Sequence, residues 1–272
     1  MKYETLNGTR IPKIGFGTWK IGGGSYADPS QDERSLAGLR SALELGYTHF
    51  DTAEVYASGH AEELLGQAIA ESGIPREELF ITSKVDPANL RYSDVLDACE
   101  KSLRRLGMDY LDLYLIHWPS RSISLGESFR ALNQLLREGK IRHVGVSNFD
   151  VRLLEQARAE SESPIFTDQV SYSLADRSYV RNGVLSYCQK NNILLTAYSP
   201  IEKGRLRGST TLRSIADAHG ATSYQTALAW LISQPRVIAI PMSLDPKHQA
   251  ENLAAAEIEL TEDEIERLNG LA

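Results

Sequence analysis

The chain is poor in features that would place it in a membrane or around a metal. Its 272 residues contain no apolar run of about 20 residues, the length of a membrane-spanning helix. Residues 1–5 show no apolar signal core, so we expect a cytoplasmic protein. The two cysteines, Cys99 and Cys188, lie far apart in helix-like segments. This spacing is not a local metal motif and predicts reduced, structural thiols, with no metal site.

Positive charge is outnumbered by negative charge. The 29 Lys and Arg residues against 36 Asp and Glu residues give a net charge of −7. This balance argues against nucleic acid or an acidic membrane as a partner. We expect a small-molecule substrate and a monomer. The chain also has no strand followed by a G-x-G-x-x-G turn that opens a helix, which argues against a Rossmann dinucleotide site.

Strand-like and helix-like segments alternate along the whole chain. Eight apolar or β-branched runs are separated by stretches of helical periodicity, a pattern that favours a parallel sheet closed into a barrel. No linker divides the sequence. We therefore predict an α/β fold, a single (β/α)₈ TIM barrel domain over residues 1–272. The runs are Ile14–Thr18, Tyr47–Thr52, Leu79–Lys84, Leu111–His117, His143–Ser147, Thr167–Tyr172, Ile193–Ser199 and Val237–Pro241.

Several additions to the barrel are expected. Asn7-Gly8 predicts the turn of an N-terminal β-hairpin. Residues 206–234 hold two helical patterns separated by Gly220, so an extra helix precedes the last strand, and another helix follows near Thr261–Asn269. Gly22–Ser25 is interpreted as a loop over the barrel rim. Three segments fit capping boxes, beginning at Ser30, Thr222 and Thr261.

Polar residues stand at or just past the ends of three successive strand-like runs. Asp51 follows Thr48-His49-Phe50, Lys84 ends the next run, and His117 ends the third. Tyr56 lies five residues beyond Asp51. In a (β/α)₈ barrel such positions converge on the carboxyl-end rim, where catalysis occurs.

These four groups suit proton transfer to a carbonyl oxygen. A phenol has a pKa of about 10 and is a weak acid near neutrality. We expect Lys84 to lower the pKa of Tyr56, and a shift of about three units would require roughly 4 kcal/mol. Asp51 would keep Lys84 charged, and His117 would position the carbonyl. General acid catalysis contributes about 10²–10⁴-fold, so a hydride donor must supply the rest.

Three longer segments carry a resemblance to a known family. Residues 46–56 (Gly-Tyr-Thr-His-Phe-Asp-Thr-Ala-Glu-Val-Tyr), Leu115–Pro119 and Gly139–Phe149 resemble motifs of the aldo-keto reductases, in the short bacterial type. The resemblance covers nearly the whole chain. It implies reduction of an aldehyde or ketone by a nicotinamide cofactor, with Tyr56 as proton donor.

The resemblance also implies positions for the cofactor and substrate. Ser147, Asn148 and Gln169 would bind the nicotinamide carboxamide, and Tyr198 would stack on its ring. Trp19 and Trp118 would flank the carbonyl. Further expected cofactor contacts are Thr18, Trp19, Ser199, Pro200, Lys203, Arg205, Ser243, His248, Glu251 and Asn252. Lys203 and Arg205 could cover the pyrophosphate or belong to a solvated basic loop.

The last motif departs from the family pattern. Met242 stands where many members have a Lys, and His248 stands in place of an Arg, both of which would grip a ribose 2′-phosphate. Losing two charge-assisted contacts costs on the order of 1.5–3 kcal/mol each. The family favours NADPH, but the two replacements make use of NADH plausible.

Two other readings remain open from the sequence. Lys84 could form a Schiff base, as in an aldolase, which would require a depressed pKa. Alternatively, the protein could be a regulatory module that binds a nicotinamide nucleotide with little turnover.

Overall fold

The computed structural model describes residues 2–201 and 208–271. It contains an eight-stranded parallel sheet, in the spatial order β10-β9-β8-β7-β6-β5-β4-β3, and a separate antiparallel hairpin, β1-β2. The strands are β1 (Tyr3–Leu6), β2 (Thr9–Pro12), β3 (Phe16–Gly17), β4 (His49–Asp51), β5 (Phe80–Val85), β6 (Leu111–Ile116), β7 (Ile141–Ser147), β8 (Ile165–Ser171), β9 (Leu194–Tyr198) and β10 (Val237–Ala239).

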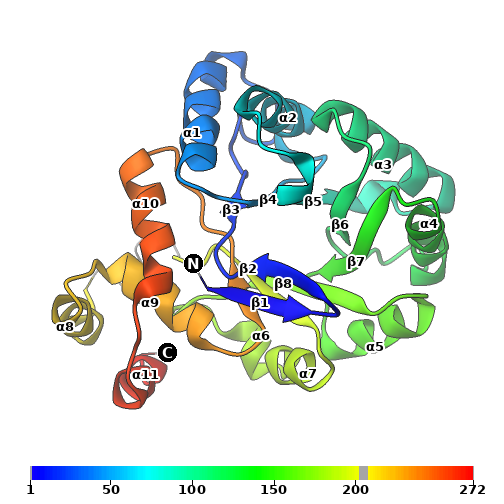
Figure 1. The fold of residues 1–272 in the computed structure, drawn as a ribbon. Coiled ribbons are helices and arrows are strands. Elements are labelled where there is room, and N and C mark those ends of the chain that lie inside the picture. Colours follow the sequence, from blue (N-terminus) through cyan, green and yellow to red (C-terminus); the bar gives the residue numbers. More distant parts are fainter. Residues whose placement is uncertain (1, 202–207, 272) are drawn as a thin grey trace.

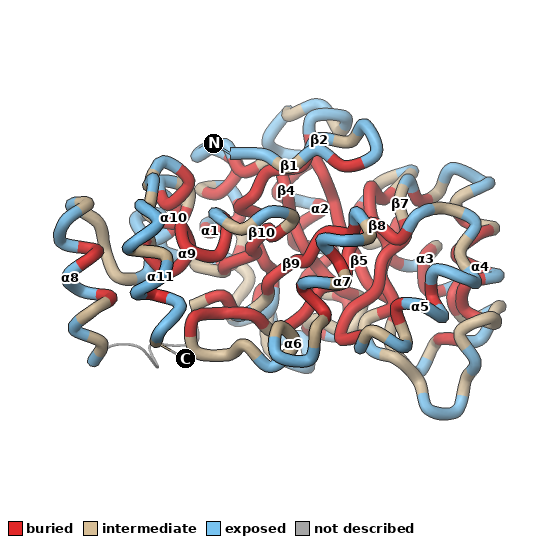
Figure 2. Tube along the Cα trace, turned by 90° about the horizontal axis from the view of Figure 1, so that it is seen from below, coloured by how far each residue is buried: buried red, intermediate tan, exposed pale blue. Residues whose placement is uncertain are grey.

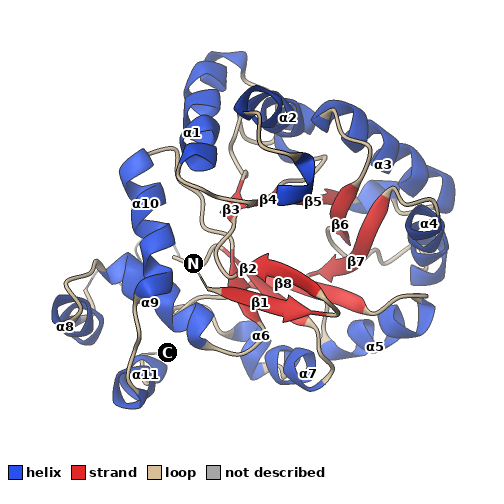
Figure 3. Cartoon of the chain, viewed as in Figure 1, coloured by secondary structure: helices blue, strands red, loops and turns tan. Residues whose placement is uncertain are grey.

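Helices surround these strands as an outer layer (Figure 1). Figure 3 shows the same arrangement by element type, with strands inside and helices outside. The α-helices are α1 (Asp32–Glu44), α2 (His60–Ser72), α3 (Tyr92–Leu106), α4 (Leu125–Arg137), α5 (Val151–Glu160), α6 (Ser178–Arg181), α7 (Val184–Lys190), α8 (Thr210–Ala218), α9 (Ser223–Ser233), α10 (Pro246–Ala254) and α11 (Glu262–Asn269). Short 3₁₀ turns include η1 (Pro29–Gln31), η2 (Tyr56–Gly59), η3 (Arg76–Glu78), η4 (Pro87–Asn89) and η6 (Ala255–Glu257).

The first and last strands of the sheet meet. A parallel bridge joins Ile14 to Ala239. The amide of Gly15 donates to Ala239 O at 2.8 Å, and the amide of Ala239 donates to Lys13 O at 2.8 Å. The predicted (β/α)₈ barrel is confirmed. Over the described ranges, the helices are all too short or too polar to span a bilayer.

The hairpin covers the amino-terminal end of the barrel, at the top of Figure 2. Its turn uses Asn7 and Gly8, with φ of 50° and 83°, as two-residue hairpins of the predicted kind require. The capping boxes at Thr222 and Thr261 are confirmed.

The capping box predicted at Ser30 is wrong. Asp28 precedes it and accepts from the Ser30 amide at 3.1 Å, so the chain first forms η1. Helix α1 then begins without a side-chain cap at Gln31. Asp28 caps the turn in place of Ser30 because it stands directly before Pro29, and proline suits the first position of a helical turn.

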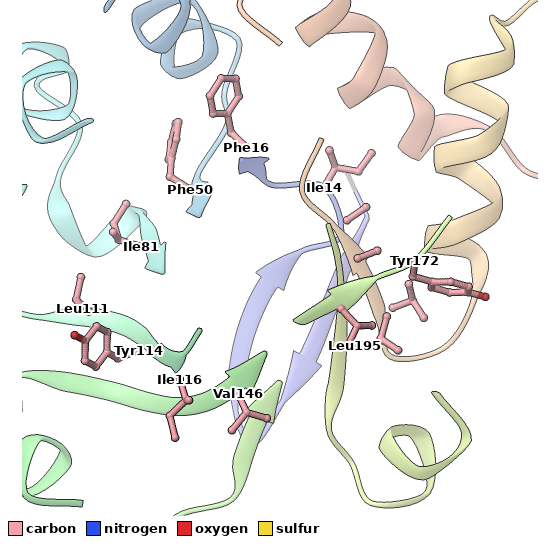
Figure 4. Packing of buried hydrophobic residues seen from close by; sticks show 14 of the residues in the cluster. Ile14, Phe16, Phe50, Ile81, Leu111, Tyr114, Ile116, Val146, Tyr172 and Leu195 are labelled. Carbon is pink, nitrogen blue, oxygen red and sulfur yellow. The ribbon is translucent and has the colours of Figure 1, made fainter. Parts of the chain in front are cut away.

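Strand residues alternate between the helices and the barrel interior. Outward-facing residues such as Phe16, Phe50 and Ile81 pack in the large apolar layer beneath the helices (Figure 4). A second, smaller apolar cluster joins the hairpin to the barrel interior through Leu6 and Phe80, among others. The eight strands of the barrel sheet are almost wholly buried, whereas the hairpin strands β1 and β2 are partly exposed (Figure 2). The inward-facing side chains of the strands therefore determine which chemical groups fill each end of the barrel interior.

Candidate active site

Every second residue of a strand faces the barrel interior, and these residues change from aromatic rings near the hairpin to charged groups at the opposite rim. Strand β5 places Phe80 toward the hairpin and Lys84 toward the opposite rim, while β4 does the same with His49 and Asp51. His117 directly follows β6, and its amide donates to Val85 O at 3.1 Å. Because β4, β5 and β6 are neighbours, the three polar groups reach one rim.

Lys84 is fully buried at the centre of a hydrogen-bonded group. Its Nζ lies 2.5 Å from Asp51 Oδ1, 2.7 Å from the carbonyl oxygen of Thr52 and 3.3 Å from Tyr56 Oη. On the far side of Asp51, Gln169 Nε2 donates to Oδ2 at 2.7 Å. The ammonium therefore points its three donors at an acid, a carbonyl and the phenol.

Tyr56 is presented by an unusual backbone turn. Ala57 and Ser58, which follow it, have φ of 49° and 55°, in the left-handed region that side chains disfavour. The turn is held by the loop over the rim, since the amide of Ala57 donates to Gly24 O at 2.9 Å. Strain of this kind persists only where surrounding contacts impose it. The sequence identified Tyr56 but gave no sign of this turn.

The opposite charges of Lys84 and Asp51 each stabilise the ionised form of the other residue. Burial lowers the pKa of Lys84, but the charge of Asp51 and contact with Tyr56 outweigh it, so the lysine pKa lies above its ordinary value. Burial raises the pKa of Asp51, and Lys84 and Gln169 oppose that shift. Lys84 is thus held as an ammonium.

The expected lowering of the Tyr56 pKa is wrong for this structure. Burial raises the pKa of the phenol, and the lowering by Lys84 does not overcome it. Asp51 adds to the rise, because its negative charge lies against Lys84 and cancels much of the ammonium's field at the phenol. Tyr56 therefore remains protonated at neutral pH, and Lys84 is in place to stabilise the phenolate once the proton leaves.

His117 lies beside the phenol as a neutral imidazole. Its ring centroid is 5.7 Å from that of Tyr56, with the rings nearly perpendicular. Burial and the nearby Lys84 lower its pKa to about 3. Its Nδ1 is buried and has no hydrogen-bond partner within residues 2–201 and 208–271. A neutral ring can orient a carbonyl but has no second proton to give.

Of the two predicted tryptophans, Trp19 packs on the phenol. Its ring centroid lies 5.0 Å from that of Tyr56, in an edge contact. Trp118 follows His117 directly and is 46% exposed, much like Trp19 at 44%. Both rings therefore present apolar surface outside the core.

The predicted carboxamide group comes together on β7, β8 and β9. Ser147 Oγ donates to Gln169 O at 2.7 Å, and Asn148, with φ of 64°, donates through Nδ2 to Ser147 Oγ at 2.9 Å. Tyr198 Oη donates to Asn148 Oδ1 at 2.9 Å. Tyr179, which the sequence analysis missed, also reaches Asn148 Oδ1, at 3.4 Å. It lies on the four-residue helix α6, which has no sequence periodicity to reveal it.

Gln169 joins this amide group to the charged group. Its side chain donates a hydrogen bond to Asp51, and its backbone carbonyl oxygen accepts one from Ser147 Oγ. Thr18, the next predicted residue, is buried after β3, and its Oγ1 lacks a hydrogen-bond partner in the described segments. Ser199 turns the chain after β9 with φ of 50°, and Pro200 is buried behind it. Lys203 and Arg205 lie outside the described residues.

The last predicted contacts surround the start of α10. Asp245 caps the helix through the Lys247 amide at 2.9 Å, and its Oδ2 lies 3.8 Å from His248 Nδ1. Asp245 also donates its own amide to Ser243 Oγ at 3.1 Å. Lys247 Nζ lies 3.9 Å from Glu251.

The segment before α10 is fixed by a residue that the sequence analysis missed. The buried Gln249 donates through Nε2 to Ser243 O at 2.9 Å and to Gly38 O at 2.8 Å. It therefore ties Ser243 to α1. Asn252 is buried on the same helix. A Gln between His248 and Ala250 on a short helix carries no sequence signal for such a role.

Three comparisons agree with this geometry. The model of the Aldo/keto reductase family matches residues 13–272. Methylglyoxal reductase YeaE of Escherichia coli (strain K12) is 40% identical over 265 residues, covering 95% of this chain and 90% of that protein.

Solved structures are also similar. The thermostable aldo-keto reductase Tm1743, solved with the inhibitor epalrestat, has a TM-score of 0.96 and 49% identity, with both chains covered completely. An aldo/keto reductase from Klebsiella pneumoniae, solved with NADP and acetate, has a TM-score of 0.87 and 38% identity over 98% of this chain and 93% of its own. The chain belongs to the aldo/keto reductase family and is an NAD(P)H-dependent carbonyl reductase.

Proposed function

We propose that this protein reduces small aldehydes and α-dicarbonyl compounds to alcohols, with Tyr56 as the general acid. The observation that carries the assignment is the 3.3 Å contact between Lys84 Nζ and Tyr56 Oη inside a buried, charge-balanced group. Relatives named for methylglyoxal and glyoxal reduction support the substrate class. We further propose that the chain works as a single-domain cytoplasmic monomer.

Each rim residue has a distinct part in the proposed reaction. Tyr56 gives its hydroxyl proton to the carbonyl oxygen as that oxygen becomes an alkoxide. Lys84 stabilises the phenolate that results, and Asp51 holds Lys84 charged. The neutral His117 donates a hydrogen bond that orients the carbonyl beside the phenol. Such positioned acid catalysis contributes about 10²–10⁴-fold.

The residues present fit a nicotinamide nucleotide, which would supply the hydride when bound. Ser147, Asn148 and Gln169 offer hydroxyl and amide groups that match a carboxamide, and Tyr198 is a part-exposed ring beside them. Thr18 Oγ1, which has no hydrogen-bond partner in the described part of the chain, adds one polar group on the same rim. These side chains would hold and orient the group with one face toward Tyr56.

The structure bears differently on the two alternative interpretations, a Schiff-base enzyme and a regulatory module. A Schiff base would need Lys84 to lose its proton, whereas its pKa is raised. A regulatory role with little turnover is instead an outcome of the test below.

The test is Tyr56→Phe, assayed with methylglyoxal and either nucleotide. We expect kcat to fall by about 10²–10⁴-fold while nucleotide binding, followed by tryptophan fluorescence, stays within a few-fold. Tyr3→Phe, at the hairpin end, removes a hydroxyl remote from the rim and serves as the matched control. Near-normal turnover by Tyr56→Phe would remove the proposed role. Tight nucleotide binding with no turnover by the unmodified protein would favour the regulatory reading.

We also propose that the protein accepts NADH alongside NADPH. NADPH use is supported by related structures solved with NADP or NADPH. At the start of α10, however, Met242 offers no charge, and His248 lies 3.8 Å from the carboxylate of Asp245. A carboxylate at a helix N-terminus already occupies the position that favours an anion, so it opposes a 2′-phosphate there. Lys247 is 79% exposed, and its ammonium already pairs with the carboxylate of Glu251 at 3.9 Å.

Met242→Lys tests this proposal. We expect the ratio of kcat/KM for NADPH to that for NADH to rise by about 10–100-fold, because one charge-assisted contact to the phosphate is restored. Met242→Leu, which changes shape but not charge, is the control. A thousandfold preference for NADPH in the unmodified protein would show that NADH tolerance is wrong.

A further inference from the structure

A cavity of about 460 Å³ shares part of its wall with the active site. Trp19 belongs both to its wall and to the active site, where its ring lies 5.0 Å from the Tyr56 ring. Val55, directly before Tyr56, also lines it. A carbonyl held at Tyr56 would therefore direct the rest of its molecule toward this cavity. Its charged and polar lining residues are Ser25, Tyr26, Glu54, Ser58, Asp86, Asn89 and Arg105.

Two carboxylates in this wall each have one oxygen that accepts no hydrogen bond from the described residues. Glu54 Oε1 accepts from the Asp86 amide at 2.6 Å and from Asn89 Nδ2 at 3.1 Å. Asp86 Oδ1 accepts from the Ala88 amide at 2.8 Å. Among residues 2–201 and 208–271, no hydrogen bond reaches Glu54 Oε2 or Asp86 Oδ2. Both side chains are partly exposed.

The arginine in the wall does not balance these carboxylates. Arg105 places Nε 2.7 Å and an Nη 2.6 Å from Glu62 Oε2. Glu62 is fully buried, and its other oxygen accepts from Ser83 at 2.5 Å. The charges of Arg105 and Glu62 therefore offset each other, and Glu54 with Asp86 leave the cavity negative.

We propose that this cavity receives the distal end of the carbonyl substrate and that Glu54 and Asp86 select its charge. Carboxylates accept hydrogen bonds and attract cations, so they favour substrates that carry hydroxyl or amino groups. They repel a carboxylate or phosphate at the same place, which rejects anionic carbonyl compounds. This selection rests on the proposed function, because it concerns the substrate of the same site.

The experiment uses two aldehydes of similar shape and opposite charge, 4-(trimethylammonio)benzaldehyde and 4-carboxybenzaldehyde. The quantity measured is the ratio of kcat/KM for the cation to that for the anion. Asp86→Asn and Glu54→Gln retain a side-chain oxygen that can accept the hydrogen bonds holding each turn but remove the charge. Each should lower the ratio by about tenfold, because a carboxylate at roughly 6 Å in a water-like medium changes each rate by about threefold, in opposite directions.

The controls separate this selection from other effects. Comparing variants with the same two aldehydes cancels their intrinsic reactivities. Glu266→Gln removes the same charge from α11, across the molecule from α2 and α3 (Figure 1), and should leave the ratio unchanged. In the unmodified protein, raising the salt concentration should reduce any cation preference through screening.

Two kinds of failure can be told apart. If neither variant lowers the ratio, or if the ratio in the unmodified protein does not respond to salt, the charge selection is overturned while carbonyl reduction stands. If the unmodified protein reduces no aldehyde with either nucleotide, it is the proposed function that fails.

Discussion

The two ends of the barrel interior each hold a histidine, fully buried at the hairpin end and partly buried at the rim, and the two rings differ in the chemistry of their neighbours. At the hairpin end, burial and Lys84 lower the pKa of His49 to about 3. At the rim, the same causes lower the pKa of His117 to about 3. In both rings Nδ1 lacks a hydrogen-bond partner in the described parts of the chain.

Their neighbours differ. His49 contacts the ring of Phe80 edge-on, with centroids 5.4 Å apart, and Phe80 in turn stacks with Phe166, which stacks with His143. His117 lies against a phenol that contacts an ammonium. A perturbed pKa therefore reports burial at both ends, and the chemistry of the neighbours decides which end is functional.

Breaking the charged pair at the rim should have the largest effect. Lys84→Met leaves Asp51 buried without its counter-charge, and we expect a loss of about 3–5 kcal/mol in the free energy of unfolding, together with loss of turnover. Adding Asp51→Asn removes the stranded charge and should recover most of the stability but not the activity. Urea unfolding and a kcat measurement check both. If Lys84→Met alone kept its free energy of unfolding within about 1 kcal/mol of that of the unmodified protein, the buried pair would not have the stabilising role described.

Truncating the hairpin end should cost stability without touching the chemistry. Phe166 is fully buried, and its ring lies 4.4 Å from that of His143. We expect Phe166→Ala to lose about 3–5 kcal/mol through the cavity it leaves. Its kcat/KM at a temperature where it remains folded should stay close to normal. A selective fall in kcat would mean that the two ends are coupled more tightly than their separation in the barrel suggests.

The smallest expected effect is on the pH dependence of stability. The unfolded chain protonates His49 near pH 6.5, whereas the folded protein resists protonation until about pH 3. Stability from the neutral ring is thus present above pH 6.5 and decreases as the pH falls toward 3. Between pH 7 and 5 the loss is about 2 kcal/mol per histidine.

His49→Gln removes one such contribution, so its unfolding free energy should fall by about 2 kcal/mol less over that range. His117→Gln should show the same difference, although only this second variant should impair turnover. Unequal pH slopes for the two variants would break the comparison between the ends of the barrel.

The amino-acid sequence by itself determined the barrel and the membership of its rim. Period-two alternation places Lys84 four residues from Phe80 on one strand face, and the repetition of strand and helix brings the strand ends together. These features are local, so they can be read from short segments. The same holds for the hairpin turn and for the caps at Thr222 and Thr261.

Only the tertiary structure decided the balance of forces inside the site. Gln169 reaches Asp51 across 118 residues, and Gln249 fixes Ser243 from within a helix, contacts that no local pattern encodes. The pKa of Tyr56 rises because burial and Asp51 together exceed the effect of Lys84. Desolvation and the sum of nearby charges depend on three-dimensional distances, so a list of residues can name the participants without fixing which effect prevails.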